Sequence, residues 1–417
     1  MDPSTVRAKS DDKGGGSLKG VLAMRPLEML RNLKVSIYAM LAILFLTYVV
    51  CFGIQTSAAT TPTKSYATRE LPEVSQGMLH RRSYFYIGAT YVPIANETSA
   101  ISAGQMYVER LTPLKVRQNI PIVIIHGRSM TGTNFLNTPN GRPGWADYFL
   151  SQGYELYIID QPSRARSPWQ QGVDGPQTIF DALRIEQRFT ATKRFNLWPN
   201  AGLHTQWPGN GSRGDETFDS FYASIVPALT SNAEASQKFI PVGLALLDKI
   251  GPAILITHSQ SGLYGWPLAD ARPQLVKAIV ALEPLGPPFI NAVFPPFEAR
   301  SPADLQTVIT YSTTNFTCIQ QASPPRKLTN LSNIPVLVVT SESGFHSVFD
   351  WCSVQFLKDA GVPVEHAELG KVGIKGNGHM LFMEENSLKI AERPGAMSKD
   401  ESYYEEGHPG ISSSSSF

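Results

Sequence analysis

Short, almost entirely apolar runs recur along the chain, and they limit its fold more than any other feature of the sequence. The runs are Ile120–Ile125, Glu155–Ile159, Ala253–Thr257, Ala278–Leu282 and Pro335–Thr340. Strands that are buried on both faces have this pattern. Helical stretches lie between them, at Trp145–Gln152, Val242–Ile250 and Val354–Ala360. The alternation predicts an α/β fold with a mostly parallel central sheet flanked by helices.

The predicted α/β domain spans about residues 81–395. It opens with a pair of strands at Ser83–Gly88 and Gln105–Arg110 and closes with a helix at Glu384–Glu392. Residues 396–417 end in a run of serines, which predicts a disordered tail.

A segment at about 163–237 breaks the alternation and is rich in Gly, Pro and Asn. An insertion at the carboxyl edge of the sheet is the expected place for a cap or lid over a substrate pocket. Its aromatic residues would either line an apolar pocket or form the core of the insertion itself. These residues are Trp169, Phe195, Trp198, Trp207, Phe218, Phe221 and Tyr222.

The amino-terminal region differs in kind from the rest. Val35–Ile54 contains no charged residue and is long enough, as a helix of about 30 Å, to cross a bilayer. All nearby cations precede it, which predicts a cytosolic tail at 1–34, a transmembrane signal anchor, a stem at 55–80 and a lumenal or extracellular domain. This is single-pass type II topology. The alternative is a signal peptide cleaved after Ala59, which would make the protein secreted.

Glycosylation motifs and cysteines agree with export. Four sequons follow the apolar span, at Asn96, Asn210, Asn315 and Asn330. Cys318 and Cys352 form an even pair in the exported part, where a disulfide is expected, although two buried thiols would also fit.

One apolar run leads directly into His258-Ser259-Gln260 and then Ser261-Gly262. A serine on a tight turn between a buried strand and a helix is exposed and firmly oriented, as a nucleophile must be. The next backbone N–H, that of Gln260, would lie where it stabilises an oxyanion. Small residues are expected two positions before and after the serine; Ser261 fits, whereas Thr257 is a departure.

A second strand ends in Ile125-His126-Gly127-Arg128, where the other oxyanion donors would come from Gly127 or Arg128. With an elbow serine next and a late histidine, this order resembles the α/β-hydrolase superfamily from about Tyr84 to Glu392. Several spaced motifs are similar to those of a group of fungal and bacterial serine esterases with a Ser-Glu-His triad. The motifs are His126–Gly132, Gly144–Asp147, Asp160–Ser163, His204–Gly209, His258–Gln260 and Ala281–Pro284.

The resemblance implies the remaining catalytic residues. His379, in a glycine-bracketed loop before the last helix, falls where the superfamily has its catalytic base, whereas the other histidines are expected in structural or solvated positions. Most α/β-hydrolases would take the acid from the loop holding Glu342. The esterase group instead uses a glutamate directly after the preceding strand, which is Glu283. We favour Glu283, because a carboxylate leaving a buried strand can hold a histidine tautomer.

The sequence thus predicts an enzyme that hydrolyses small carboxylic esters or lactones through an acyl-enzyme on Ser259. An acyltransferase with the same triad, in secondary metabolism for example, and an inactive interaction module on the same fold are the alternatives. No metal or other cofactor is expected, since no His, Cys or Asp cluster has ligand spacing. With 17% charged residues and a net charge of +1, nucleic acid is not an expected partner. The oligomeric state and the natural substrate stay open.

Overall fold

The computed structural model describes residues 77–94, 99–288, 306–311, 314–318 and 320–397. The chain divides into two units, 1–74 and 75–417, and the described residues all belong to the second. The predicted span at Val35–Ile54, the sequon at Asn96 and the tail therefore lie outside the described residues. Within the described part, no helix is long and apolar enough to cross a membrane.

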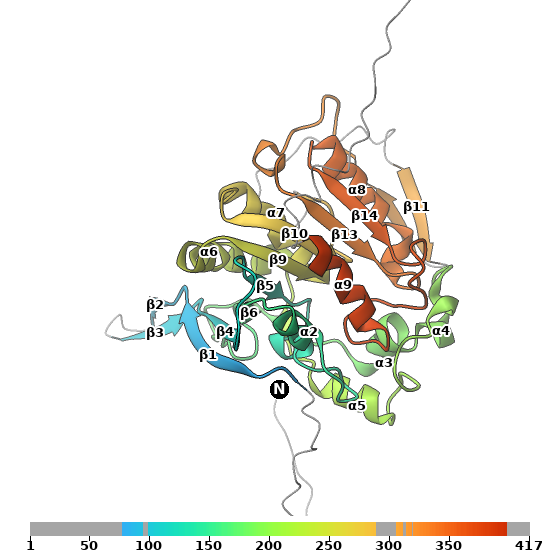
Figure 1. The fold of residues 1–417 in the computed structure, drawn as a ribbon, viewed down its shortest axis with the longest axis horizontal. Helices are drawn as coiled ribbons and strands as arrows, with labels where there is room; N and C mark the ends of the chain where they lie inside the picture. Colours follow the sequence, from blue (N-terminus) through green and yellow to red (C-terminus); the bar gives the residue numbers. More distant parts are fainter. Residues whose placement is uncertain (1–76, 95–98, 289–305, 312–313, 319, 398–417) are drawn as a thin grey trace, which may run out of the picture. The chain divides into compact units, whose positions relative to one another are not determined.

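An eight-stranded sheet forms the centre of the domain, in the order β1-β4-β6-β5-β9-β10-β13-β14 (Figure 1). Its strands are β1 (His80–Ile87), β4 (Met106–Pro113), β6 (Leu156–Asp160), β5 (Ile122–Ile125), β9 (Ala253–His258), β10 (Val276–Leu282), β13 (Val336–Thr340) and β14 (Val364–Glu368). The pairs β1–β4 and β4–β6 are antiparallel, and every later pair is parallel. The predicted mostly parallel sheet is confirmed, with β14 as an additional strand.

The central strands face two hydrophobic cores because successive side chains point to opposite faces. In β5, Ile122 and Ile124 join one core, and Val123 and Ile125 join the other. Helices α2 (Trp145–Ser151) and α9 (Ser387–Met397) cover the first face, and α6 (Asn232–Ile250), α7 (Gly262–Ala271) and α8 (Asp350–Asp359) cover the second. The sheet is thus buried on both sides, which explains its continuous apolar strands.

Three predicted helices begin at other residues, and one of them is α8, which begins at Asp350 instead of Val354. Helix α6 begins at Asn232 instead of Val242, because Ser231 caps its first turn and Pro241 is accommodated inside the helix. Helix α9 begins at Ser387, three residues later than Glu384. None of these differences affects a predicted catalytic residue.

The predicted cap segment, 163–237, contains only short elements before α6 begins at Asn232. These are β7 (Gln177–Thr178), α3 (Ala182–Ile185), a π-helical turn (Glu186–Thr190), α4 (Thr192–Phe195), a 3-10 turn (Ala201–Leu203), α5 (Glu216–Ala223) and β8 (Ala228–Leu229). Two hairpins stand apart from the main sheet: β2 (Thr90–Pro93) with β3 (Ala100–Ala103), and β11 (Gln306–Tyr311) with β12 (Thr314–Cys318).

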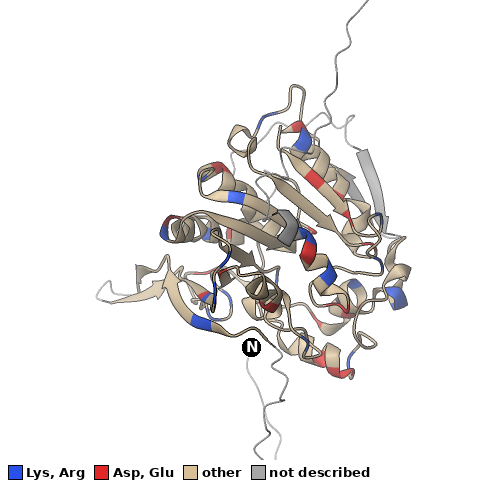
Figure 2. Cartoon of the chain, viewed as in Figure 1, with Lys and Arg blue, Asp and Glu red and all other residues tan. Residues whose placement is uncertain are grey.

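Charged residues of both signs are interspersed over the described elements in the view of Figure 2, and the central strands carry almost none. The sequons at Asn210 and Asn330 are exposed, and Asn315 lies in β12. Their glycosylation stays a prediction.

The structure joins Cys318, at the end of β12, to Cys352 in α8 by a disulfide across a sequence separation of 34 residues. Loop closure of this length in the unfolded chain is worth about 3–4 kcal/mol. We expect the Cys318→Ser/Cys352→Ser variant to lose about that free energy of unfolding, measured by tryptophan fluorescence in urea. Dithiothreitol should lower the wild-type midpoint to that of the variant and leave the variant unchanged; equal midpoints throughout would contradict the prediction.

Candidate active site

Ser259 stands on a strained turn at the carboxyl end of β9. Every residue of β9 is buried, and the chain turns at Ser259 with a φ of 52° before a 3-10 turn (Ser259–Ser261) and α7. A side chain in the left-handed region costs free energy and persists only where the surroundings hold it. Strain of this kind is typical of the nucleophile turn of α/β-hydrolases.

The small residues Ser261 and Gly262 have different structural roles in this turn. The Ser261 hydroxyl accepts a hydrogen bond from His258 N at 2.7 Å and lies 2.7 Å from the Ile125 carbonyl oxygen, to which it can donate. A side chain at Gly262 would come within 2.4 Å of Pro284 Cβ. The closest packing thus occurs one residue later than predicted, at Gly262, while Thr257 is accommodated as a buried strand residue.

The loop after β5 approaches Ser259 through a glycine. A Cβ atom on Gly127 would lie 3.1 Å from Ser259 Cβ and 2.8 Å from His258 Nδ1, so only glycine lets the backbone come this close. The buried Arg164 donates to Gly127 O at 2.8 Å and to Gln260 Oε1 at 3.0 Å. It thereby connects the two segments predicted to form the oxyanion hole. Sequence reasoning missed Arg164, which no motif marks.

His379 and Glu283 meet at the same edge of the sheet. Glu283 directly follows β10 with a φ of 42°, and its Oε2 lies 2.5 Å from His379 Nδ1. Both side chains are at most 1% exposed. The other carboxylate oxygen accepts hydrogen bonds from the backbone N–H of Ser341, at 2.9 Å, and from the Ser341 hydroxyl. The carboxylate is therefore fixed from two sides.

Glu342 lies elsewhere. Its Oε2 accepts a hydrogen bond at 2.7 Å from the backbone N–H of Gly376, three residues before His379. It shapes the loop that carries the histidine, whereas Glu283 contacts the imidazole itself. Of the two predicted acids, the structure brings only Glu283 to His379.

Burial and neighbouring charges set the protonation of this pair. Burial lowers the pKa of His379 below its ordinary value of 6.5, and the hydrogen bond with Glu283 offsets only part of that effect. For Glu283, burial acts to raise the pKa, but the His379 hydrogen bond and charge outweigh it and the pKa is lowered. At neutral pH the pair consists of a neutral imidazole and a carboxylate, which is the form that a general base requires.

A second histidine, His346, packs on the first. Its ring stacks on His379 with a centroid distance of 5.0 Å and an interplanar angle of 12°, and its Nδ1 lies 2.7 Å from Asp350 Oδ1. Burial acts to lower the pKa of His346, but Asp350 overcomes this and the pKa is raised. The sequence placed His346 in a loop or at a strand edge; it lies in a short 3-10 turn, Phe345–Val348, where its side chain is buried. Its only sequence signal was the i, i+4 spacing to Asp350.

Glu283, His346 and His379 also bring three potential metal-ligand atoms within 4.8 Å of one another. His379 Nδ1 is already paired with Glu283, and His346 Nδ1 with Asp350. The cluster is thus a hydrogen-bonded network, in which a metal ion would have to displace the His379–Glu283 contact.

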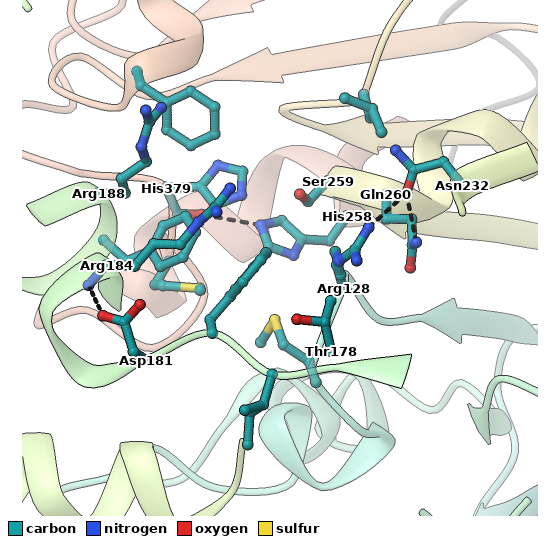
Figure 3. Close-up of a pocket in the computed structure, with 17 residues that line it drawn as sticks. Arg128, Thr178, Asp181, Arg184, Arg188, Asn232, His258, Ser259, Gln260 and His379 are labelled. Atoms are coloured by element: carbon teal, nitrogen blue, oxygen red, sulfur yellow. Dashed lines mark hydrogen bonds between the residues drawn. The ribbon is translucent and has the colours of Figure 1, made fainter. Parts of the chain in front are cut away.

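Ser259 and His379 line one pocket of about 510 Å³ (Figure 3). Residues of the cap segment, from Thr178 to Phe189, form its opposite wall. The insertion's aromatic residues named above do not line it. Trp207, Phe218 and Phe221 are instead buried in the hydrophobic core on the first face of the central sheet.

This sheet, the serine turn and the loops at the carboxyl edge define the domain as an α/β-hydrolase. A solved bacterial esterase has the same fold, with a TM-score of 0.52 and 22% identity over 78% of this chain and 96% of that one. Naproxen esterase (carboxylesterase NP) from Bacillus subtilis aligns with a TM-score of 0.36 and 15% identity, over 77% of this chain and 92% of that one. Models of known protein families give no match.

A curated fungal relative defines the family more closely. The probable secreted lipase phiG of Fungal sp. (strain ATCC 74256) is 46% identical over 329 residues, which cover 74% of this chain and 87% of the relative. The chain belongs to the family of that lipase. The predicted α/β-hydrolase class is confirmed and, at the level of the family, so is an ester-hydrolysing enzyme.

Proposed function

We propose that this protein is a serine esterase that cleaves carboxylic ester or lactone bonds through an acyl-enzyme on Ser259. The observation that carries the proposal is the buried His379–Glu283 pair, joined at 2.5 Å, whose histidine lines the same pocket as Ser259. In this assignment Ser259 is the nucleophile, His379 the base and Glu283 the acid that orients the base.

In the first half-reaction, the neutral imidazole of His379 takes the Ser259 proton as the oxygen attacks the ester carbonyl carbon. The resulting oxyanion accepts hydrogen bonds from the backbone N–H groups of Gln260 and the Gly127–Arg128 turn. The C–O bond of the ester then breaks, and the leaving alcohol takes the proton from His379.

In the second half-reaction, His379 takes a proton from water, and the hydroxide attacks the acyl carbon. The bond to Ser259 breaks, the serine oxygen regains the proton and the carboxylic acid leaves. Glu283 accepts the Nδ1–H of His379 throughout and stabilises the imidazolium. If an alcohol replaced water in this half-reaction, the same residues would transfer the acyl group.

A fluorophosphonate probe and two esters, 4-nitrophenyl acetate and butyrate, test the proposal on the exported domain. Labelling of Ser259, located by mass spectrometry of the labelled peptide, together with ester turnover would support it. A folded protein that is neither labelled nor active on either ester would refute it. Product analysis with water and an alcohol in competition separates hydrolysis from acyl transfer.

The pH dependence of kcat/KM should show an acid limb with an apparent pKa below 6.5. A general base acts only when neutral, and burial lowers the pKa of His379, so activity is lost only as the pH falls through that lowered value. The measurement is initial rates of 4-nitrophenyl butyrate hydrolysis from pH 4 to 8, with Ser259→Ala as the blank. A midpoint above pH 7 would contradict the assignment of His379.

We further propose that the catalytic domain is exported, by the apolar segment at Val35–Ile54 acting either as an anchor or as a cleaved signal peptide. The sequons and the Cys318–Cys352 disulfide fit an oxidising compartment. Amino-terminal sequencing of the purified natural protein distinguishes the two: a chain that starts near Thr60 has been cleaved.

A further inference from the structure

The pocket above Ser259 and His379 is rich in positive charge. Three arginines, Arg128, Arg184 and Arg188, line it, against a single carboxylate, that of Asp181 (Figure 3). An esterase for neutral lipid-like substrates has no need of such a set, because each guanidinium must be kept hydrated or paired. The excess positive charge of the pocket therefore favours an anionic ligand.

Arg184 and Arg188 belong to one continuous helical stretch, formed by α3 and the π-helical turn that follows it. Residues four apart share a face of a helix, and like charges at that spacing destabilise it. Partial desolvation lowers the pKa of Arg184, although its side chain is largely exposed, and the charge of Arg188 lowers it further. The local structure thus tolerates a repulsion that an anion between the two side chains would relieve.

Arg128 approaches from the opposite side, on the loop after β5. Its Nη1 donates to two neutral acceptors, Thr230 O and Asn232 Oδ1, both at 3.2 Å. Its Nε is buried and has no hydrogen-bond partner among the described residues. Arg128 and Arg184 both lie against the ring of Phe180, at 5.6 and 4.4 Å from its centroid. One aromatic ring therefore holds two guanidinium groups beside the same cavity.

Asp181 offsets only part of this positive charge. Its carboxylate Oδ1 accepts a hydrogen bond at 2.9 Å from the backbone N–H of Arg184, as the N-cap of α3. Among the described residues, no salt bridge links Arg128 or Arg184 to a carboxylate. Guanidinium groups without a carboxylate partner are suited to bind a planar anion that accepts paired hydrogen bonds. A carboxylate is such an anion.

We propose that the substrate of this enzyme is an ester that carries a free carboxylate, recognised by Arg128 and Arg184. This inference rests on the proposed esterase activity and adds the charge of its substrate. The carboxylate lies beside Phe180, and the ester carbonyl reaches Ser259 in the same pocket.

Two matched substrate pairs test the inference on either side of the ester bond. Mono-4-nitrophenyl adipate and 4-nitrophenyl hexanoate differ at the end of the acyl chain, where a carboxylate replaces a methyl group. 4-Acetoxybenzoate and 4-methylphenyl acetate differ in the same way on the alcohol. We expect kcat/KM to favour the anionic member of at least one pair by about tenfold or more, mainly through KM. Added NaCl should reduce that preference.

The variant Arg184→Gln should remove most of the preference, since it deletes one of the two positive charges from an exposed position where folding is not at risk. The matched control is Arg194→Gln in the same cap segment. Arg194 is exposed, bonded to Ser212 and absent from the lining of this pocket, so the preference should persist.

The outcomes separate the inference from the proposed function. If the neutral esters are hydrolysed and neither anionic partner is preferred, or if Arg184→Gln leaves a preference intact, the carboxylate inference is overturned and the esterase stands. If no ester is hydrolysed and the fluorophosphonate does not label Ser259, both are overturned.

Discussion

Replacing Ser259 with alanine should lower kcat for 4-nitrophenyl butyrate by about 10⁴- to 10⁶-fold. The loss is large because alanine removes the atom that forms the acyl-enzyme, and water would have to attack without the help of a fixed nucleophile. The oxyanion donors would remain, so a small activity above the uncatalysed rate is expected. The measurement is the steady-state rate of ester hydrolysis, and the uncatalysed rate in buffer sets its lower limit.

A matched control is Ser83→Ala, on the exposed part of the edge strand β1, which should hydrolyse the ester as the wild type does. Fluorophosphonate labelling should vanish in the Ser259 variant and persist in the control. The thermal unfolding midpoint shows whether Ser259→Ala is folded; alanine keeps the Cβ atom at the same positive φ, so the midpoint should stay close to that of the wild type. A folded Ser259→Ala variant with undiminished turnover would show that another group is the nucleophile.

Glu283→Gln should lower kcat by about 10³- to 10⁴-fold with a smaller effect on KM. The glutamine amide would offer an N–H as well as a carbonyl to His379 Nδ1, so the imidazole would lose its fixed tautomer and the stabilisation of its charged form. Because the carboxylate also accepts two hydrogen bonds from Ser341, some loss of stability should accompany the loss of rate. Rates must therefore be compared below the unfolding temperature of the variant.

Glu342→Gln is the matched comparison. Its carboxylate accepts one backbone hydrogen bond, from Gly376, and a glutamine carbonyl can accept the same bond. We expect little change in kcat. The opposite pattern, a large loss of kcat in Glu342→Gln and an active Glu283→Gln, would identify Glu342 as the acid, in the loop that most α/β-hydrolases use. Equal, small effects in both variants would argue against a carboxylate partner for His379.

The agreement between sequence and structure is greatest where an element is decided locally. β5, β9 and β13 were predicted within two residues, because an unbroken apolar run between turn residues has few other solutions than a buried strand. β14 was missed because its exposed and buried residues, Val364-Glu-His-Ala-Glu368, do not form such a run. It lies at the edge of the sheet, where one side is less completely covered.

The residues of the site also fall into two groups: those that the local sequence marks and those that only long-range contacts bring together. Ser259 and Gly127 could be found from the sequence because each is defined by its immediate neighbours: a buried strand, then a tight turn. Arg164, His346 and the three pocket arginines carry no such local mark. Their roles depend on contacts such as Arg164 with Gly127, 37 positions apart, and His346 with His379, 33 positions apart.

By itself, the sequence determined the α/β architecture and the serine turn, because these follow from apolar patterning and turn residues along a short stretch of chain. Its resemblance to known hydrolases and esterases added the two candidate acids. Only the tertiary structure decided which acid meets His379 and what charge surrounds the substrate pocket. Glu283 follows β10 and Glu342 follows β13, and these strands are parallel neighbours. Position along the chain therefore does not distinguish the two glutamates. The backbone turn at Glu283 directs its carboxylate to the imidazole, and the packing of the cap segment gathers the arginines above the serine. Both depend on side-chain directions that are set by packing between segments far apart in the sequence.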